Sequence, residues 1–165
     1  MRKWYLVYSR PRQERIAMEN LERQGYESYL PLIKRHRRRQ GRRVVQVEPM
    51  FPRYLFICLD TQTDNWAPIR STRGVNRLVR FGLDPAVVPM DLLEILKARE
   101  NEEGVQNVSP VDFRHGDRVR ISEGPLMGYE GIFLAKSSQE RVTILLNVVN
   151  KQMRIKANPA QLETA

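Results

Sequence analysis

The sequence predicts an α+β fold in two domains, and three observations support this prediction. Strand-like and helix-like segments alternate over residues 1–101, which is typical of an antiparallel sheet flanked by helices. Residues 102–110 contain Gly, Asn, Ser and Pro with hardly any large apolar side chain, and therefore predict a linker. Residues 111–165 open on a glycine-punctuated run, Gly116–Phe133, which predicts a tight hairpin in a small, strongly curved sheet.

The first domain is expected to begin with one strand and one helix. Lys3–Tyr8 is rich in aromatic and branched side chains, which favour a strand. Pro11 suits the start of a helix, and Arg12–Gln24 carries apolar side chains along one helical face before Gly25 ends the pattern. A βα unit is therefore expected over residues 3–24.

Three further strands are expected before residue 60. Tyr26–Ile33 and Val44–Val47 predict a long hairpin, because the segment that joins them is charged and contains Gln40-Gly41. Phe51–Leu59 has the strongest strand pattern in the chain. Cys58 is the only cysteine, so disulfides and thiolate metal clusters are excluded, and we expect it to pack in the core.

The remaining elements of the first domain are shorter. Trp66 and Ile69 are three residues apart, which predicts a short helix over Thr63–Ser71. A strand is expected over Val75–Phe81, and a helix over Asp91–Glu100, where four Leu and Ile residues cluster.

The charge of the chain is unevenly distributed. The net charge is +9, and residues 1–100 hold 20 Lys and Arg against 11 Asp and Glu, whereas residues 101–165 hold eight of each. This excess predicts a polyanionic partner or an acidic protein surface for the first domain. The densest stretch, Lys34–Arg43, has seven Lys and Arg in ten residues, and could lie along a phosphate backbone or be a solvated loop.

Catalysis has almost no support in the sequence. His36 and His115 lie in dissimilar segments, Cys58 has no base placed beside it, and there is no phosphate-binding glycine loop or metal-ligand cluster. We therefore expect a protein that is not an enzyme and needs no cofactor or metal. The N-terminal apolar run is too short for a signal peptide and no stretch is long enough to span a bilayer, so a cytoplasmic location is expected.

Several motifs together resemble the NusG family of transcription elongation factors. They follow one another in the family's order: Trp4–Tyr8, Glu48–Phe56, Thr72–Val75, Val79–Gly82 and the segment Gly116–Phe133, which is similar to the KOW motif. The compact spacing and the ending Leu145–Lys151 are most similar to the RfaH branch of specialised paralogues. The resemblance implies a NusG-type N-terminal domain over residues 1–101 and a KOW domain over 111–165 that folds as an SH3-like β-barrel.

The resemblance also implies partners for the first domain. NusG-type proteins grip a coiled-coil of the largest subunit of RNA polymerase, and exposed apolar and aromatic side chains would complement such a helical pair. Ordinary core packing is the alternative role for each of these side chains. The residues that could form the docking face are Leu6, Tyr8, Phe51, Pro52, Tyr54, Phe56 and Phe81.

A second set of residues matches positions with which RfaH-type proteins read the non-template DNA strand. Arg and Gln can hydrogen-bond to unstacked base edges. This nucleic-acid-binding set comprises Arg10, Asn20, Arg23, Gln24, Arg70, Thr72 and Arg73. Asn20 stands where that branch usually has histidine, and Asn65-Trp66-Ala67 replaces a His-Thr-Thr contact to the opposite polymerase subunit, so both contacts are expected to differ here.

The C-terminal segment is compatible with two structures. Val142, Leu145, Leu146 and Val149 follow helical spacing, but alternate residues from Val142 to Val148 follow strand spacing. RfaH-type domains exist as an α-helical hairpin docked on the N-terminal domain and, when released, as a barrel. Glu48 and Arg141 match the salt bridge that locks the closed form. We expect a barrel in the active state, with the helical hairpin as the alternative at rest.

The expected function is that of a monomeric elongation and antitermination factor. It would bind polymerase and non-template DNA through the first domain and suppress pausing and termination. The KOW domain would contact other machinery, with a ribosomal small-subunit protein as a candidate. A general NusG-like factor without sequence-specific recruitment, and a ribosomal or other RNA-binding KOW protein, are the alternatives.

Overall fold

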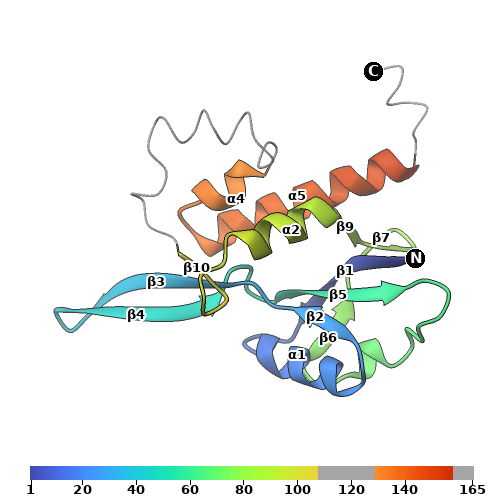
Figure 1. The fold of residues 1–165 in the computed structure, drawn as a ribbon, viewed down its shortest axis with the longest axis horizontal. Helices are drawn as coiled ribbons and strands as arrows, with labels where there is room; N and C mark the ends of the chain where they lie inside the picture. Colours follow the sequence, from blue (N-terminus) through green and yellow to red (C-terminus); the bar gives the residue numbers. More distant parts are fainter. Residues whose placement is uncertain (108–128, 158–165) are drawn as a thin grey trace. The chain divides into compact units, whose positions relative to one another are not determined.

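The computed structural model describes residues 1–107 and 129–157, which form a mixed α+β structure (Figure 1). The described residues pack as two compact units. One unit comprises residues 1–30, 53–90 and 145–157; the other comprises residues 31–52, 91–107 and 129–144. The division into domains at residues 101 and 111 stays a prediction. Within the described residues, no helix is long and apolar enough to cross a membrane.

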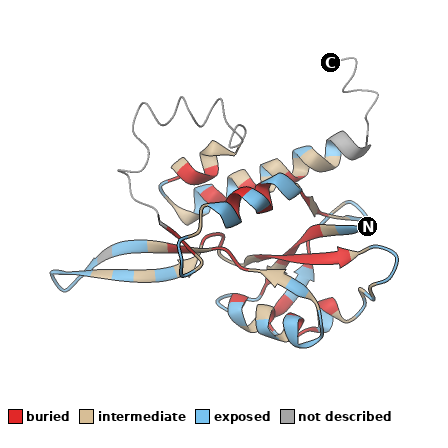
Figure 2. Cartoon of the chain, viewed as in Figure 1, coloured by how far each residue is buried: buried red, intermediate tan, exposed pale blue. Residues whose placement is uncertain are grey.

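The first unit is built on a five-stranded antiparallel sheet, which confirms the predicted sheet type. Strand β1 (Arg2–Ser9) pairs with β5 (Tyr54–Asp60), and β2 (Glu27–Tyr29) and β6 (Val75–Leu78) extend the order to β2-β5-β1-β6. Strand β9 (Val87–Val88) also pairs with β1. β1 and β5 supply most of the buried apolar side chains of this sheet, including Cys58, whose predicted packing role is confirmed (Figure 2).

Helix α1 (Glu14–Arg23) buries its apolar face within the first unit. Ala17 and Leu21 are fully buried on that face. Gly74, which follows a short 3₁₀ helix, η1 (Ile69–Ser71), has φ +89°, and a Cβ there would come within 2.6 Å of the backbone nitrogen of Ala17. Only glycine therefore fits where this loop meets the helix.

The second unit contains a three-stranded sheet that differs from the prediction. The strand expected over Tyr26–Ile33 is broken at Pro31, after which β3 (Leu32–Arg39) belongs to a separate sheet. A residue without an N–H cannot continue the ladder, which explains the break. The basic stretch is not a loop: it lies in β3, in β4 (Arg42–Pro49) and in the turn between them.

Two residues suffice to turn between β3 and β4. Gln40 and Gly41 have φ values of 54° and 76°. Two successive positive φ values match the tight hairpin turn whose twist suits antiparallel strands. Strand β10 (Val105–Asn107) pairs in parallel with the start of β3, so part of the segment expected to be a linker is a strand.

Several boundaries in the first unit are also shifted. β5 begins at Tyr54 instead of Phe51, because Pro52 cannot donate a hydrogen bond and Arg53 has φ 73°. Of the helix expected over Thr63–Ser71, only η1 is helical, and Val75–Phe81 is divided between β6 and β7 (Arg80–Phe81). Strand β8 (Asp84–Pro85), which pairs with β7, was not predicted, and neither was β9.

The remaining helices are α2 (Met90–Ala98), α4 (Glu130–Leu134) and α5 (Ser138–Ala157). The strand expected at the end of Gly116–Phe133 is wrong for its described part, because Gly131–Phe133 is helical. Burial of Ile132 and Phe133 offsets the roughly 1 kcal/mol that Gly131 costs in a helix. The predicted hairpin from Gly116 to Gly128 lies outside the described residues, and the described helices correspond to the alternative, helical form.

Candidate functional site

One face of the five-stranded sheet carries a row of aromatic side chains. Tyr8 lies opposite Tyr54 in the β1–β5 ladder, and Leu6 lies opposite Phe56. Residues directly opposite on antiparallel strands share a face. The Tyr8 and Tyr54 ring centroids are 5.0 Å apart, and Tyr29 of β2 stacks on Phe56 at 6.1 Å. The prediction that Tyr54 and Phe56 share an aromatic face is therefore confirmed.

Two arginines that the sequence analysis did not assign lie over this face. The guanidinium carbon of Arg53 is 4.0 Å from the Tyr8 ring centroid, and that of Arg77 is 5.5 Å away. The Arg53 backbone N–H donates to the Glu14 carboxylate at 3.0 Å, and its Nε donates to the Ser9 carbonyl at 3.2 Å. These bonds hold Arg53 in its left-handed conformation. Arg77 comes over Tyr8 through the pairing of β6 with β1, which no local pattern indicates.

The predicted docking residues divide into buried and part-exposed ones. Leu6, Phe51 and Phe56 are fully buried in this structure, as ordinary core residues would be. Four others retain accessible surface: Tyr8, Pro52, Tyr54 and Phe81. Burial raises the pKa of Tyr54, and the Tyr8 hydroxyl adds to this, while Arg77 and Arg53 oppose it. Tyr54 therefore stays a neutral hydroxyl donor at neutral pH.

The predicted nucleic-acid contacts lie around α1 and η1. Gln24 Nε2 donates to Thr72 Oγ1 at 2.8 Å, which joins the C-terminal end of α1 to the end of η1. The Arg10 N–H donates to the Gly74 carbonyl at 2.8 Å. The structure therefore brings Arg10, Gln24 and the Thr72–Gly74 loop together, although they are far apart in the sequence.

Not every member of this set is accessible. The exposed side chains are those of Arg10, Arg23, Gln24, Arg70 and Arg73. Thr72 is buried and donates to the Pro68 carbonyl at 2.9 Å, so it orients Gln24 within the fold. Asn20 is half-buried, and its Nδ2 donates to the Ile16 carbonyl at 2.7 Å. Their roles in DNA contact stay predictions.

A hollow of about 510 Å³ lies beside this set in the same unit. Its apolar lining comes from Trp66, Ile69 and Leu78, and its charged lining comes from arginines. Arg70, Arg77 and Arg80 are all exposed, and Arg80 is oriented by a 3.0 Å hydrogen bond to the Leu83 carbonyl. An apolar surface next to guanidinium groups suits a phosphate-bearing ligand with a planar base.

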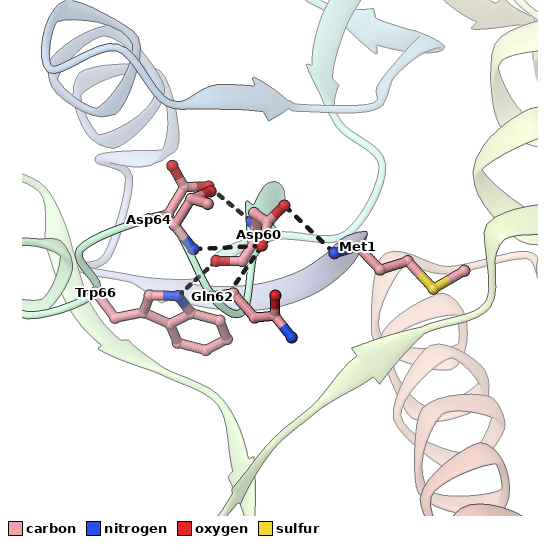
Figure 3. Close-up of polar contacts among 6 residues, drawn as sticks. Met1, Asp60, Gln62, Asp64 and Trp66 are labelled. Atoms are coloured by element: carbon pink, nitrogen blue, oxygen red, sulfur yellow. Dashed lines mark hydrogen bonds and ion pairs between the residues drawn. The ribbon is translucent and has the colours of Figure 1, made fainter.

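Trp66 is held by a network of polar contacts around Asp60 (Figure 3). Its indole N–H donates to the Asp60 carbonyl at 3.3 Å, and its ring meets Tyr5 edge-on at 4.7 Å. The Asp60 carboxylate accepts from the Gln62 N–H at 2.8 Å and pairs with the Met1 ammonium at 3.3 Å. The backbone bond from Gln62 lowers the pKa of Asp60, and the Met1 charge adds to this. Trp66 is thus part of a fixed loop.

The predicted Glu48 and Arg141 pair lies in the second unit. Arg141 on α5 is buried, and its Nε donates to the Met50 carbonyl at 2.9 Å. Burial lowers the pKa of Arg141, while the negative charge of Glu48 opposes this shift. Glu48 also pairs with Arg35 at 3.5 Å. The salt bridge between these two residues stays a prediction.

Other features of the described residues bear on function. Tyr129 donates to the Asp91 carboxylate at 2.6 Å, and Arg99 lies 4.4 Å from the Phe133 ring centroid, so α4 packs on α2 within the second unit. Among residues 1–107 and 129–157, no three His, Cys, Asp or Glu side chains are grouped so that they could hold a metal ion.

Comparison with known proteins identifies relatives of this chain. The family model described as "Transcription termination factor nusG" matches residues 2–97. "Transcription termination/antitermination protein NusG" of Neisseria meningitidis serogroup B is 26% identical over 173 residues, which cover 98% of this chain and 94% of the relative. The protein of the same name from Thermus thermophilus is 25% identical over 182 residues, with 98% of each chain covered.

A solved structure was also found. It is titled "Domain interaction in Thermotoga maritima NusG", with 24% identity, a TM-score of 0.40 and coverage of 62% of each chain. The family match rests on the sequence comparisons, since the matched model spans more than half of the 165 residues. The chain belongs to the NusG family of transcription termination/antitermination factors.

Proposed function

We propose that this chain is an elongation and antitermination factor of the RfaH branch, which binds RNA polymerase through residues 1–101 and suppresses pausing and termination. Factors of the NusG family work with the transcription machinery. The observation that carries the proposal is the aromatic face of the β1–β5 ladder. Its part-exposed tyrosines, Tyr8 and Tyr54, contact each other, and Arg53 and Arg77 lie over the Tyr8 ring.

The chemistry of that face suits a helical partner. Ordered aromatic rings offer apolar area at a low entropy cost, and hydroxyl groups at the edge can bond to polar side chains of an amphipathic coiled-coil. Arginines over the rings add donors for acidic side chains. The coiled-coil of the largest polymerase subunit is a partner of this kind.

Co-migration with core RNA polymerase tests the docking face. We expect the variant Tyr8→Ala with Tyr54→Ala to lose binding by tenfold or more, because two aromatic anchors are removed. Leu83→Ala is a matched control, since Leu83 is 92% exposed and lies outside this face. The double variant must keep the wild-type circular dichroism. Undiminished binding by a folded double variant would rule out this face.

Contact with non-template DNA is proposed for the exposed side chains around α1 and η1. Arg10, Arg23 and Arg73 would meet phosphates, and Gln24, held by Thr72, would meet a base edge. Transcription through a pause site, with and without the protein, measures whether the protein suppresses pausing. A general NusG-like factor without sequence-specific recruitment is the second candidate, because the Asn20 amide is already bonded to the backbone of its own helix.

The C-terminal segment is proposed to change structure between two states. The helices α4 and α5, with Arg141 fixed on the Met50 carbonyl, support a helical resting form. Release of the C-terminal segment from the N-terminal domain would allow it to fold as a KOW barrel. The candidate partner of this barrel is a ribosomal small-subunit protein. Backbone chemical shifts of the full chain and of residues 108–165 alone are the test. Identical helical or identical barrel shifts in both samples would contradict the change.

A further inference from the structure

The β3–β4 ribbon ends in four arginines that face one another in pairs. Arg38 lies opposite Arg43, and Arg39 lies opposite Arg42. All four side chains are exposed. Like charges directly opposite on antiparallel strands destabilise the pairing. The tip therefore holds charges whose mutual repulsion a polyanion would relieve.

The base and the tip of the ribbon differ in how their charges are neutralised. At the base, Lys34 pairs with Glu103 at 3.4 Å and Arg35 pairs with Glu48 at 3.5 Å. Residues 36–47 contain no Asp or Glu. None of the four tip arginines forms an ion pair with a described residue. The uncompensated charge is thus concentrated at the tip.

Both faces of the tip are basic. Because side chains alternate along a strand, Arg38 and Arg43 lie on one face of the ribbon, and Arg39 and Arg42 lie on the other. A ribbon lying on a single nucleic-acid strand would need cations on one face. A groove of duplex DNA has phosphates along both walls, and the arrangement of the tip matches that geometry.

The width of a two-stranded ribbon suits the major groove of B-form DNA and not that of A-form RNA. The major groove of B-form DNA is about 12 Å wide and 8.5 Å deep and admits a two-stranded ribbon, whereas the A-form RNA major groove is too narrow. β10 pairs only with Leu32–Lys34, so Arg35–Arg39 continues beyond it by about 17 Å at the usual rise per residue.

We propose that the ribbon tip, Arg38–Arg43, is a binding site for double-stranded DNA and enters its major groove. Phosphates on one wall pair with Arg38 and Arg43, and phosphates on the other wall pair with Arg39 and Arg42. The site is separate from the aromatic face and does not depend on polymerase binding.

Fluorescence anisotropy of the full-length protein with a labelled 20-base-pair duplex tests the site. Two variants are compared: Arg38→Gln with Arg43→Gln, and Arg39→Gln with Arg42→Gln. We expect each to weaken binding by at least about tenfold near 0.1 M salt and to lower the slope of log affinity against log salt by about 2, because each removes two phosphate contacts. Lys151→Gln with Arg154→Gln is the control, since it removes the same charge from an exposed part of α5.

Two further probes separate groove entry from general attraction. Methylation at guanine N7 fills the major groove and should weaken binding of the wild-type protein. Single-stranded DNA of the same length should respond less to either variant than duplex does. Circular dichroism must show that both variants keep the wild-type fold, and co-migration with polymerase should be unchanged in both.

Three outcomes would overturn the proposal. An effect of only one arginine pair would show that a single face of the ribbon contacts nucleic acid. Equal losses for single-stranded and duplex DNA would show unspecific attraction to polyanions. Losses no larger than those of the α5 control would show that the tip is a solvated turn. Loss of polymerase binding in the folded Tyr8 and Tyr54 variant, with duplex binding intact, would leave the DNA site standing.

Discussion

The α1–η1 region and the β3–β4 ribbon are both rich in arginine, but they hold it differently. Around α1 and η1, side chains are connected by hydrogen bonds across long sequence separations, such as Gln24 to Thr72. On the ribbon tip, arginines oppose arginines and no described carboxylate pairs with them. The first arrangement fixes the direction of Gln24 and suits recognition of a particular group. The second leaves side chains free and suits recognition of charge and shape.

The largest expected effect is a difference in the free energy of unfolding between a variant of the packed sheet and a variant of the solvated ribbon. Phe56→Ala should lower the free energy of unfolding by about 3–5 kcal/mol, because Phe56 is fully buried. Val45→Ala, on the half-exposed ribbon, should change it by no more than about 0.5 kcal/mol. Urea denaturation followed by circular dichroism gives both values. Similar losses in the two variants would show that the ribbon contributes to the core.

The next effect tests the close approach that positions the α1–η1 region. Gly74→Ala should cost about 3 kcal/mol, from a strained positive φ and from a Cβ 2.6 Å from the Ala17 nitrogen. Gly82 has φ +65° with open space around its Cβ position, so Gly82→Ala should cost only the backbone strain, about 1–2 kcal/mol. Thermal unfolding of both variants measures the difference. Equal costs would mean that α1 moves to accept the methyl group.

A smaller effect with the opposite sign is expected at the ribbon tip. Arg39→Gln removes a like-charge pair with Arg42 and should raise the free energy of unfolding by about 0.5 kcal/mol. The gain should shrink in 1 M salt, because exposed charges are then screened. Urea denaturation at two salt concentrations measures it. A loss of stability at low salt would mean that the opposing arginines are compensated within the fold.

The smallest effect concerns the loop that holds Trp66. The folded-state pKa of Asp60 is lowered, so its carboxylate contributes stability at neutral pH that is lost as the pH falls below its ordinary value of 3.8. Asp60→Asn should therefore reduce the drop in melting temperature on acidification. Melting curves between neutral pH and pH 3 measure the drop. An unchanged pH profile would show that Asp60 does not contribute through its charge.

Much of the first unit could be predicted because its signals are local. The aromatic run of β1, the apolar face of α1 and the core of β5 are visible in the sequence, and the shared face of Tyr54 and Phe56 follows from strand alternation. Strands β8 and β9 have two residues each, which is too short for a periodicity to reveal them, and β9 forms only by pairing with the distant strand β1.

The site was predicted less completely, for related reasons. Arg77 stands over Tyr8 because β6 pairs with β1 in one register, and the sequence does not specify that register. The Glu14 bond to Arg53 joins residues 39 positions apart. The hairpin that turns at Gln40-Gly41 was predicted from a local signal, whereas the break at Pro31, also a local signal, was missed. The C-terminal segment has both periodicities, so pattern alone does not decide its structure.

The interleaving of the two units has a consequence for synthesis. The first unit combines segments from the start, the middle and the end of the chain, the second combines residues 31–52 with 91–107 and 129–144, and α5 contributes residues to both. A chain that emerges from the ribosome in order can pair β1 with β5 early, but it cannot complete either unit until residues beyond 138 have emerged. The helical form is therefore assembled late, whereas the sheet is ready first. The sheet thus has a period during synthesis in which no α5 is present to pack on it.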